Sequence, residues 1–134
     1  MRDTEDNMQE QNIHKTEATH YVADFYQIED QKSLDDMDFC AKTVKGAVEI
    51  SGCGILNIYQ HKFSPQGLSI TATLSESHCT IHTWPERGYC AIDLYGCGRA
   101  NLRAGIDFFT AQFKPGKIRL IELQRGHEHE NRPA

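Results

Sequence analysis

The sequence predicts an α+β fold, a two-layer sandwich with a mostly antiparallel sheet covered on one face by two helices. Six short segments are rich in β-branched and aromatic residues, which is typical of strands. Short turns join four of these segments, and this favours antiparallel neighbours. Two longer segments carry apolar residues at helical spacing. The elements therefore follow the order β-α-β-β-β-β-α-β within one domain.

The first strand is expected within "THYVADFYQI" (residues 19–28). Ser33 is followed three residues later by Asp36, a signal close to a capping box, so a helix is predicted over about residues 34–50. The helix is amphipathic and ends at Gly52 and Gly54. Its apolar positions are Met37, Cys40, Ala41, Val44, Ala47 and Val48.

Two hairpins are expected next. The segments "ILNIYQHKF" and "GLSITATLS" are joined by "SPQG", and "HCTIHTW" and "YCAIDLYG" are joined by "PERG". A second helix ends at Pro115 and Gly116. Its apolar stripe consists of Leu102, Ile106, Phe109 and Phe113. The segment "KIRLIEL" is predicted to be the last strand.

The two ends of the chain are charged and lack periodicity. Residues 1–17 are therefore expected to form a flexible N-terminal arm and residues 125–134 a flexible C-terminal tail. A single domain is expected over residues 18–124. His127 and His129 in the tail are expected to be solvated.

Composition excludes several classes of partner. The formal net charge of -5, without a basic cluster, argues against nucleic acid. No apolar run approaches the roughly 18 residues of a membrane span, and the first residues are too polar and acidic for a signal peptide. The odd number of cysteines, without a CxxC pair, indicates a cytoplasmic protein whose thiols are mostly buried and free. They are Cys40, Cys53, Cys79, Cys90 and Cys97.

Reactive side chains gather in "LSESHCTIHTWPERGYCAIDLYGCG" (residues 74–98). A metal site is one reading, but His78 and His82 would lie about 13 Å apart on a strand. One ion does not bridge that distance, so no metal is predicted. A hydrolase is a second reading, but the segment has neither a nucleophile elbow nor a cysteine-protease signature.

The third reading starts from Glu76 and Ser77. A serine hydroxyl can attack the carbonyl of the preceding residue and turn the amide into an ester. Loss of the Ser77 Cα proton then eliminates the Glu76 carboxylate, and the dehydroalanine that remains hydrolyses to a pyruvoyl group and ammonia. This ketone forms a Schiff base with a substrate amine and serves as an electron sink for decarboxylation.

The pattern "ESH.TIHTWPE.GY.AIDLY.CG" resembles the signature of the prokaryotic-type S-adenosylmethionine decarboxylases. "HKFSPQG" and "VADFY" match further family segments, and the resemblance covers roughly residues 19–124. It implies a pyruvoyl enzyme that converts S-adenosylmethionine to S-adenosylmethioninamine and CO2 for spermidine biosynthesis. It also implies a homodimer of processed protomers.

The resemblance assigns a role to each matching residue. Ser77 is the pyruvoyl precursor, and the bond between Glu76 and Ser77 is the one cleaved. His82 is the base in processing, Ser69 assists it, and Cys97 donates a proton to the decarboxylated carbon. In the substrate pocket, Phe63 stacks on adenine, Glu86 binds the ribose, and Trp84 lies beside them.

Some positions depart from the family pattern. Gly96 stands where a threonine is common, Cys79 and Cys90 replace apolar or small residues, and "RANLRAG" lacks the usual acidic start. Two alternatives therefore stay open: a pyruvoyl-dependent arginine or ornithine decarboxylase on the same scaffold, and a non-processing homologue that acts as a binding or regulatory subunit. Phe63, Trp84 and Glu86 are all retained, and they favour the nucleoside substrate.

Strand geometry raises a problem, because side chains five residues apart point to opposite faces of a strand. Ser77 and His82 are separated in this way. Either the site is shared, with Ser77 and Cys97 from one chain and Phe63, Ser69, His82 and Glu86 from the other, or a bulge between Ser77 and His82 shifts the alternation.

Overall fold

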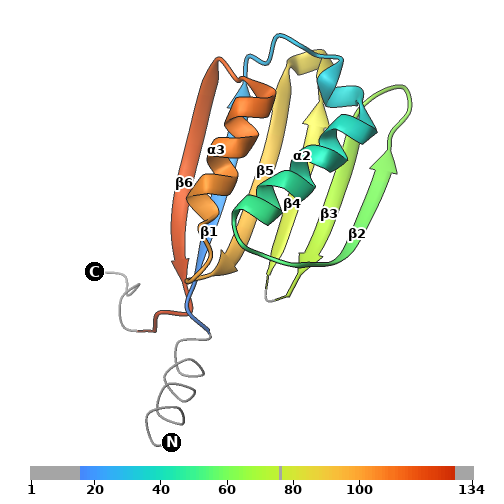
Figure 1. The fold of residues 1–134 in the computed structure, drawn as a ribbon. Helices are drawn as coiled ribbons and strands as arrows, with labels where there is room; N and C mark the ends of the chain where they lie inside the picture. Colours follow the sequence, from blue (N-terminus) through green and yellow to red (C-terminus); the bar gives the residue numbers. More distant parts are fainter. Residues whose placement is uncertain (1–15, 76, 129–134) are drawn as a thin grey trace, which may run out of the picture.

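The computed structural model describes residues 16–75 and 77–128, and its fold is the predicted α+β sandwich. The strands are β1 (Ala18–Tyr26), β2 (Ile55–Lys62), β3 (Leu68–Leu74), β4 (His78–Trp84), β5 (Tyr89–Cys97) and β6 (Lys117–Arg125). The helices are α2 (Met37–Ile50) and α3 (Leu102–Phe113), with 3-10 turns η2 (Ser33–Asp35) and η3 (Pro85–Arg87). Both helices cross the same face of the sheet (Figure 1).

The six strands pair antiparallel in the order β2-β3-β4-β5-β1-β6. The strands from β2 to β5 form a meander of successive hairpins. The first strand then inserts between β5 and β6, so the two ends of the domain are hydrogen-bonded to each other. This insertion brings His20 opposite Tyr95 and Leu123, and it could not be predicted from turn lengths.

The helix α2 begins later than predicted. The side chain of Asp36 accepts a hydrogen bond from the Phe39 amide and is the N-cap, whereas the Ser33 hydroxyl donates to the Asp30 carbonyl within the preceding turn. The prediction of a start at residue 34 is therefore wrong by three residues. Asp36 stabilises the first turn because it satisfies an amide that has no partner within the helix. The chain leaves the helix at Gly52, with φ of 81°.

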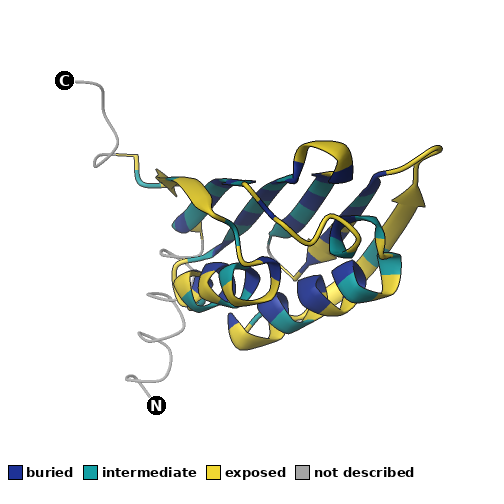
Figure 2. Ribbon diagram, turned by 90° about the horizontal axis from the view of Figure 1, so that it is seen from above, coloured by how far each residue is buried: buried dark blue, intermediate teal, exposed yellow. Residues whose placement is uncertain are grey.

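The core lies between the helices and one face of the sheet. The apolar stripe predicted for each helix is buried apart from the half-buried Met37, and alternate residues of β1, β3, β4 and β5 meet it. Burial seen from above follows this pattern, with buried bands on the strands beside the helices (Figure 2). Cys40, Cys79 and Cys90 belong to this core, as predicted for most of the thiols. Burial raises the pKa of Cys40 and Cys79 to about 12, so these thiols stay protonated.

The opposite face of the sheet, here called the outer face, is covered by neither α2 nor α3. Its side chains alternate with those of the core, and most of them are half-buried by their neighbours. It carries Ser69 from β3, His78, Thr80, His82 and Trp84 from β4, Tyr89, Asp93, Tyr95 and Cys97 from β5, and His20, Val22, Asp24 and Tyr26 from β1. Four of the predicted site residues, Ser69, His82, Trp84 and Cys97, thus share one face.

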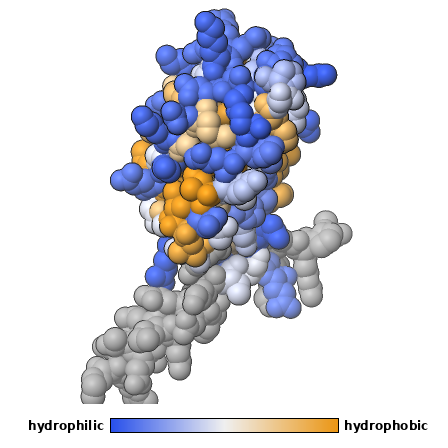
Figure 3. Space-filling view, turned by 90° about the vertical axis from the view of Figure 1, so that its right-hand side faces the viewer, coloured by the Kyte–Doolittle hydropathy of each residue, from blue (hydrophilic) through white to orange (hydrophobic). Residues whose placement is uncertain are grey.

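The β2 edge exposes apolar side chains. Ile55 and Leu56 at the start of β2 are 36% and 68% exposed, and Ile50 at the end of α2 is exposed as well. A hydrophobic patch among polar side chains is visible from this side (Figure 3). In the described part of the chain, neither helix is long and apolar enough to cross a membrane.

The described parts of the termini lie together. The Glu17 carbonyl accepts a hydrogen bond from the Gly98 amide, and the Glu17 carboxylate lies 3.9 Å from His127 Nδ1. The His127 side chain is only 14% exposed, so the prediction that it is solvated is wrong. His129, most of the predicted arm and most of the predicted tail lie outside the described residues.

Candidate active site

The predicted site residues fall into two groups at opposite ends of β4. Ser77 lies directly before β4 and Cys97 ends β5, so both are at the end of the sheet that is lower in Figure 1. Ser69, His82 and Trp84 lie at the other end, with Phe63 and Glu86 in the neighbouring loops. Five residues of extended chain separate Ser77 from His82, about 16 Å. One protomer therefore does not bring the two residues together.

A bulge does not remove this separation. The pairing of β4 with β5 runs without a shift from His78 opposite Tyr95 to Trp84 opposite Tyr89. The alternation of side chains is therefore regular throughout β4, and the predicted bulge is absent from the strand. The shared site is the remaining alternative.

Ser77 closes the tight turn between β3 and β4. Its carbonyl accepts a hydrogen bond of 2.8 Å from the Leu74 amide, while its own amide lies 3.5 Å from the Leu74 carbonyl. The carbonyl side of Ser77 is thus well held and its amide nitrogen only weakly. That nitrogen belongs to the bond predicted to break; Glu76, on the other side of the bond, lies outside the described residues.

Two histidines and a tyrosine surround the start of β4 on the outer face. The His78 ring lies 5.3 Å from the Tyr95 ring and 5.8 Å from the His20 ring, measured between centroids. His20 Nε2 is 2.9 Å from an oxygen of Asp93, and Arg125 lies over the Tyr95 ring. Burial, and then the neighbouring His20, lower the pKa of His78. A neutral imidazole therefore follows Ser77 in the sequence at neutral pH.

At the other end of β4, Ser69 and His82 form a hydrogen-bonded pair. The two residues lie directly opposite each other on β3 and β4, and Ser69 Oγ is 2.6 Å from His82 Nδ1. This contact fixes the ring orientation of His82 and leaves Nε2 available on the outer face. The geometry suits a base whose reactive nitrogen is aimed by a neighbouring hydroxyl.

The loops beside His82 hold an aromatic ring and a carboxylate. Phe63 is 48% exposed, and Glu86 in η3 accepts a hydrogen bond of 3.2 Å from the Gln66 amide group. The same loop is tied to η2, because Asp35 accepts from the Gly67 amide and from Lys62. The loop from β2 to β3 is therefore anchored at both sides while the Phe63 ring stays accessible.

Trp84 is the exposed end of a stack of three rings. Its indole is 41% exposed and stacks on Tyr89 with centroids 5.1 Å apart, and Tyr89 stacks on Tyr26 at the same spacing. The hydroxyls of Tyr89 and Tyr26 donate to the two oxygens of Asp24, at 2.5 and 3.3 Å. Burial, and then this hydrogen bond, raise the pKa of Tyr89.

Gly96 packs closely against the start of α3. A Cβ at this position would lie 2.8 Å from Leu102 Cδ2, at the start of α3. Leu102 is buried there and fills the space that a threonine side chain would need. The glycine before Cys97 is thus matched to the leucine at the start of α3.

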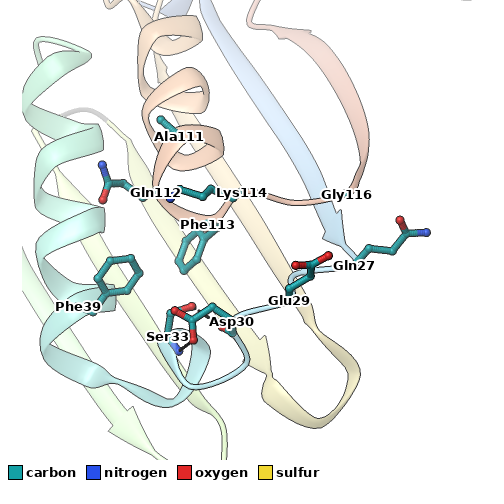
Figure 4. Close-up of a pocket in the computed structure, with 10 residues that line it drawn as sticks. All are labelled: Gln27, Glu29, Asp30, Ser33, Phe39, Ala111, Gln112, Phe113, Lys114 and Gly116. Carbon is teal, nitrogen blue, oxygen red and sulfur yellow. Dashed lines mark hydrogen bonds between the residues drawn. The ribbon is translucent and has the colours of Figure 1, made fainter.

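Within residues 16–75 and 77–128, no group of three or more His, Cys, Asp and Glu residues is placed to hold a metal ion. A cavity of about 640 Å³ lies between the end of α3 and the start of α2, where Phe39 and Phe113 face it (Figure 4). None of the predicted site residues lines this cavity.

Sequence reasoning missed two sets of residues beside the site: His20, Asp93 and Tyr95 near Ser77, and Asp24 and Tyr89 beside Trp84. Alternation in "HYVADFY" and "YCAIDLY" places each set on one face of its strand. Only the insertion of β1 next to β5 brings the sets together across strands.

Comparison with known proteins gives a consistent picture. A family model described as S-adenosylmethionine decarboxylase matches residues 19–126. The S-adenosylmethionine decarboxylase proenzyme of Geobacillus kaustophilus is 39% identical over 111 residues, 83% of this chain and 89% of that protein. The proenzyme of Methanococcus aeolicus is 40% identical over 98 residues, 72% of this chain and 84% of that protein.

Solved structures agree with the fold. The crystal structure of the adenosylmethionine decarboxylase from Aquifex aeolicus superposes with a TM-score of 0.78 at 27% identity, covering 89% of this chain and 98% of that chain. The Trypanosoma brucei AdoMetDC superposes with a TM-score of 0.55 at 16% identity, over 81% of this chain and 46% of that chain. The second likeness concerns the fold alone.

Proposed function

This chain belongs to the S-adenosylmethionine decarboxylase family, and on that premise we propose that it is a self-cleaving proenzyme that decarboxylates S-adenosylmethionine. Cleavage between Glu76 and Ser77 turns Ser77 into a pyruvoyl group. When formed, this group supplies a ketone that accepts the substrate amine and takes up the electron pair released as CO2 leaves. No metal is needed in this scheme.

The environment of Ser77 fits the group that would be made there. The Ser77 amide nitrogen is only weakly hydrogen-bonded to the Leu74 carbonyl. This contact therefore does little to oppose the departure of the nitrogen from Glu76 as the Ser77 hydroxyl attacks. The well-held Ser77 carbonyl keeps the new end of the second fragment against β3. Cleavage consumes one water and releases one ammonia. The residues that follow Ser77 are paired with β3 from His78 to His82 and with β5 from His78 to Trp84.

The sheet supports cleavage at this bond because it interleaves the two fragments. The first fragment would contain β1, β2 and β3, and the second β4, β5 and β6. Three strand pairings cross between them: β3 with β4, β1 with β5, and β1 with β6. The broken chain would therefore keep one fold without a covalent connection.

The observation that carries the proposal is the division of the site between opposite ends of β4. A second copy, laid against the outer face and related by a two-fold axis, would bring its His82 end to the Ser77 end of the first. Such a homodimer would hold two equal sites, each with Ser77 and Cys97 from one chain and Phe63, Ser69, His82 and Glu86 of the partner subunit. The uncovered, half-buried outer face suits this arrangement.

Each remaining side chain has a chemical reason for its role. His82, aimed by Ser69, would take the Cα proton of Ser77 during processing. An accessible Phe63 ring offers a face to adenine, and the exposed Trp84 indole offers a second aromatic face to the nucleoside. Aromatic faces also attract the substrate's sulfonium cation. The Glu86 carboxylate accepts hydrogen bonds from the two ribose hydroxyls.

Cys97 would supply the proton that completes the reaction. It lies one residue beyond Gly96, which faces the Ser77 position if the pairing of β4 and β5 is extended by one pair. A thiol gives up its proton to a carbanion more readily than a hydroxyl in the same place, because it is the stronger acid.

A decarboxylation assay with three substrates tests the proposal. CO2 release from S-adenosylmethionine is expected, with little release from arginine or ornithine, and borohydride added with substrate should abolish activity. Ser77→Ala is the matched control and should release no CO2. Faster turnover of arginine or ornithine would show that an amino acid, not S-adenosylmethionine, is the substrate. Absence of turnover in a cleaved protein would contradict the enzymatic role.

Complementation tests the shared site separately. Ser77→Ala and His82→Ala chains are each expected to remain uncleaved alone. When the two are co-folded, a mixed dimer contains one site with Ser77 from one chain and His82 from the other, so partial cleavage should return. If exchange is confirmed and no cleavage follows, the shared site is wrong.

A further inference from the structure

The stack of Trp84, Tyr89 and Tyr26 is tethered more firmly than burial alone requires. Aromatic rings on adjacent strands pack equally well without hydroxyls. Here, however, both tyrosine hydroxyls converge on one half-buried carboxylate, Asp24, and the shorter bond comes from Tyr89 at 2.5 Å. Hydrogen bonds to a charged acceptor are among the stronger ones and fix direction. These two hydrogen bonds, here called the tether, therefore fix the position of the Tyr89 ring.

The orientation of Tyr89 in turn sets the orientation of Trp84. The two residues are directly opposite each other at the ends of β5 and β4, and their rings lie 27° from parallel. One face of the indole is covered by Tyr89, yet Trp84 is still 41% exposed. Tyr89 is the described residue with which it stacks.

We propose that Tyr89 is a positioning residue for nucleoside recognition, held by Asp24 so that the Trp84 indole stands as a preformed stacking surface. The inference rests on the proposed function, since it takes the nucleoside part of S-adenosylmethionine as the ligand. A fixed ring loses less freedom on binding than a mobile one, so the tether improves affinity for the nucleoside. It should leave cleavage at Ser77 and the chemistry at Cys97 unchanged, because Tyr89 lies at the other end of its own sheet and acts on the partner's site only through the Trp84 indole.

The single tryptophan of the chain makes the proposal measurable. Trp84 fluorescence reports on the indole directly, and 5′-methylthioadenosine serves as a probe that carries the nucleoside without the amino acid. Tyr89→Phe keeps the ring and removes only the hydroxyl. Tyr26→Phe is the matched control, because it also removes a hydroxyl from Asp24 but does not stack on Trp84.

Tyr89→Phe should lower the fluorescence anisotropy of Trp84 without ligand and raise the Kd for 5′-methylthioadenosine about fivefold. The KM for S-adenosylmethionine should rise by the same factor with kcat unchanged, which a loss of global stability does not produce. Asp24→Asn removes the charged acceptor, so it should also raise the Kd and lower the anisotropy. It is the test variant if Tyr89→Phe folds poorly. Tyr26→Phe should change the Kd by less than about twofold.

The outcomes separate this proposal from the proposed function. If the wild type binds the nucleoside and Tyr89→Phe leaves Kd and anisotropy unchanged, the positioning role is wrong while the function stands. A fall in anisotropy without a change in Kd overturns the role as well. If the wild type does not bind 5′-methylthioadenosine at all, nucleoside recognition itself fails, and the role of Tyr89 falls with it.

Discussion

Thr83 connects three elements beside the Trp84 end of the site, and replacing it tests whether the connection holds them. Its side chain is buried in β4, where the hydroxyl donates to the Leu34 carbonyl at 2.7 Å and accepts from the Leu68 amide at 3.0 Å. Thr83→Val keeps the shape and β-branching but removes both bonds. Each backbone group left without a partner costs about 1–3 kcal/mol. After some relaxation, the variant should lose about 2–4 kcal/mol of unfolding free energy.

The assay is urea unfolding at one chain concentration, followed by circular dichroism and Trp84 fluorescence, in a Ser77→Ala background so that cleavage does not vary. A loss of this size should also lower Tm by on the order of 10 °C. Thr110→Val is the control, because its hydroxyl bonds to the Ile106 carbonyl of its own helix, and it should change stability by less than about 0.5 kcal/mol. If Thr83→Val were as stable as this control, the hydroxyl would not hold η2 and β3 to β4.

Three further variants test other parts of the account. Cys97→Ser should still cleave but decarboxylate far more slowly and accumulate a fragment whose blocked end has become alanine, seen by mass spectrometry; wild-type rate and lifetime would make the thiol structural. Gly96→Thr should lose about 1–3 kcal/mol by overpacking, and adding Leu102→Ala should recover part of that loss, whereas additive losses would contradict the packing argument. Hydrogen bonds from Lys62 and the Gly67 amide lower the pKa of Asp35 in the folded state. The ionised carboxylate therefore stabilises the fold fully above the unfolded-state pKa, and this stabilisation is lost as the pH falls through the lower folded-state pKa. The stability gap between wild type and Asp35→Asn should therefore shrink below about pH 4, and a gap that stays constant in acid unfolding would count against the ion pair.

The order of elements was predictable because hydrophobic spacing and turn residues are local signals. The strand "HCTIHTW" was predicted with its observed bounds, and the apolar stripe from Leu102 to Phe113 is buried. The start of α2 was misplaced because Ser33 and Asp36 are both good caps, and their choice depends on the preceding turn. There the Ser33 hydroxyl is already engaged by the Asp30 carbonyl.

The site was predictable only as a set of residues. Motif resemblance selects Ser77, His82 and Cys97, but it does not say that a regular strand keeps Ser77 and His82 apart. The contacts of Tyr89 with Asp24 and of His20 with Tyr95 depend on the insertion of β1 beside β5. That pairing joins residues about 70 positions apart, and no local pattern encodes it.

The intact mass of the purified protein tests the central claim most directly. Self-cleavage predicts two polypeptides that remain associated until denatured, residues 1–76 and residues 77–134. The second should be lighter than a serine-ended fragment by the mass of ammonia, and Ser77→Ala should give one uncut chain. A wild-type protein that stays full length under all folding conditions, or one cut with a free serine at its new end, would contradict the pyruvoyl enzyme.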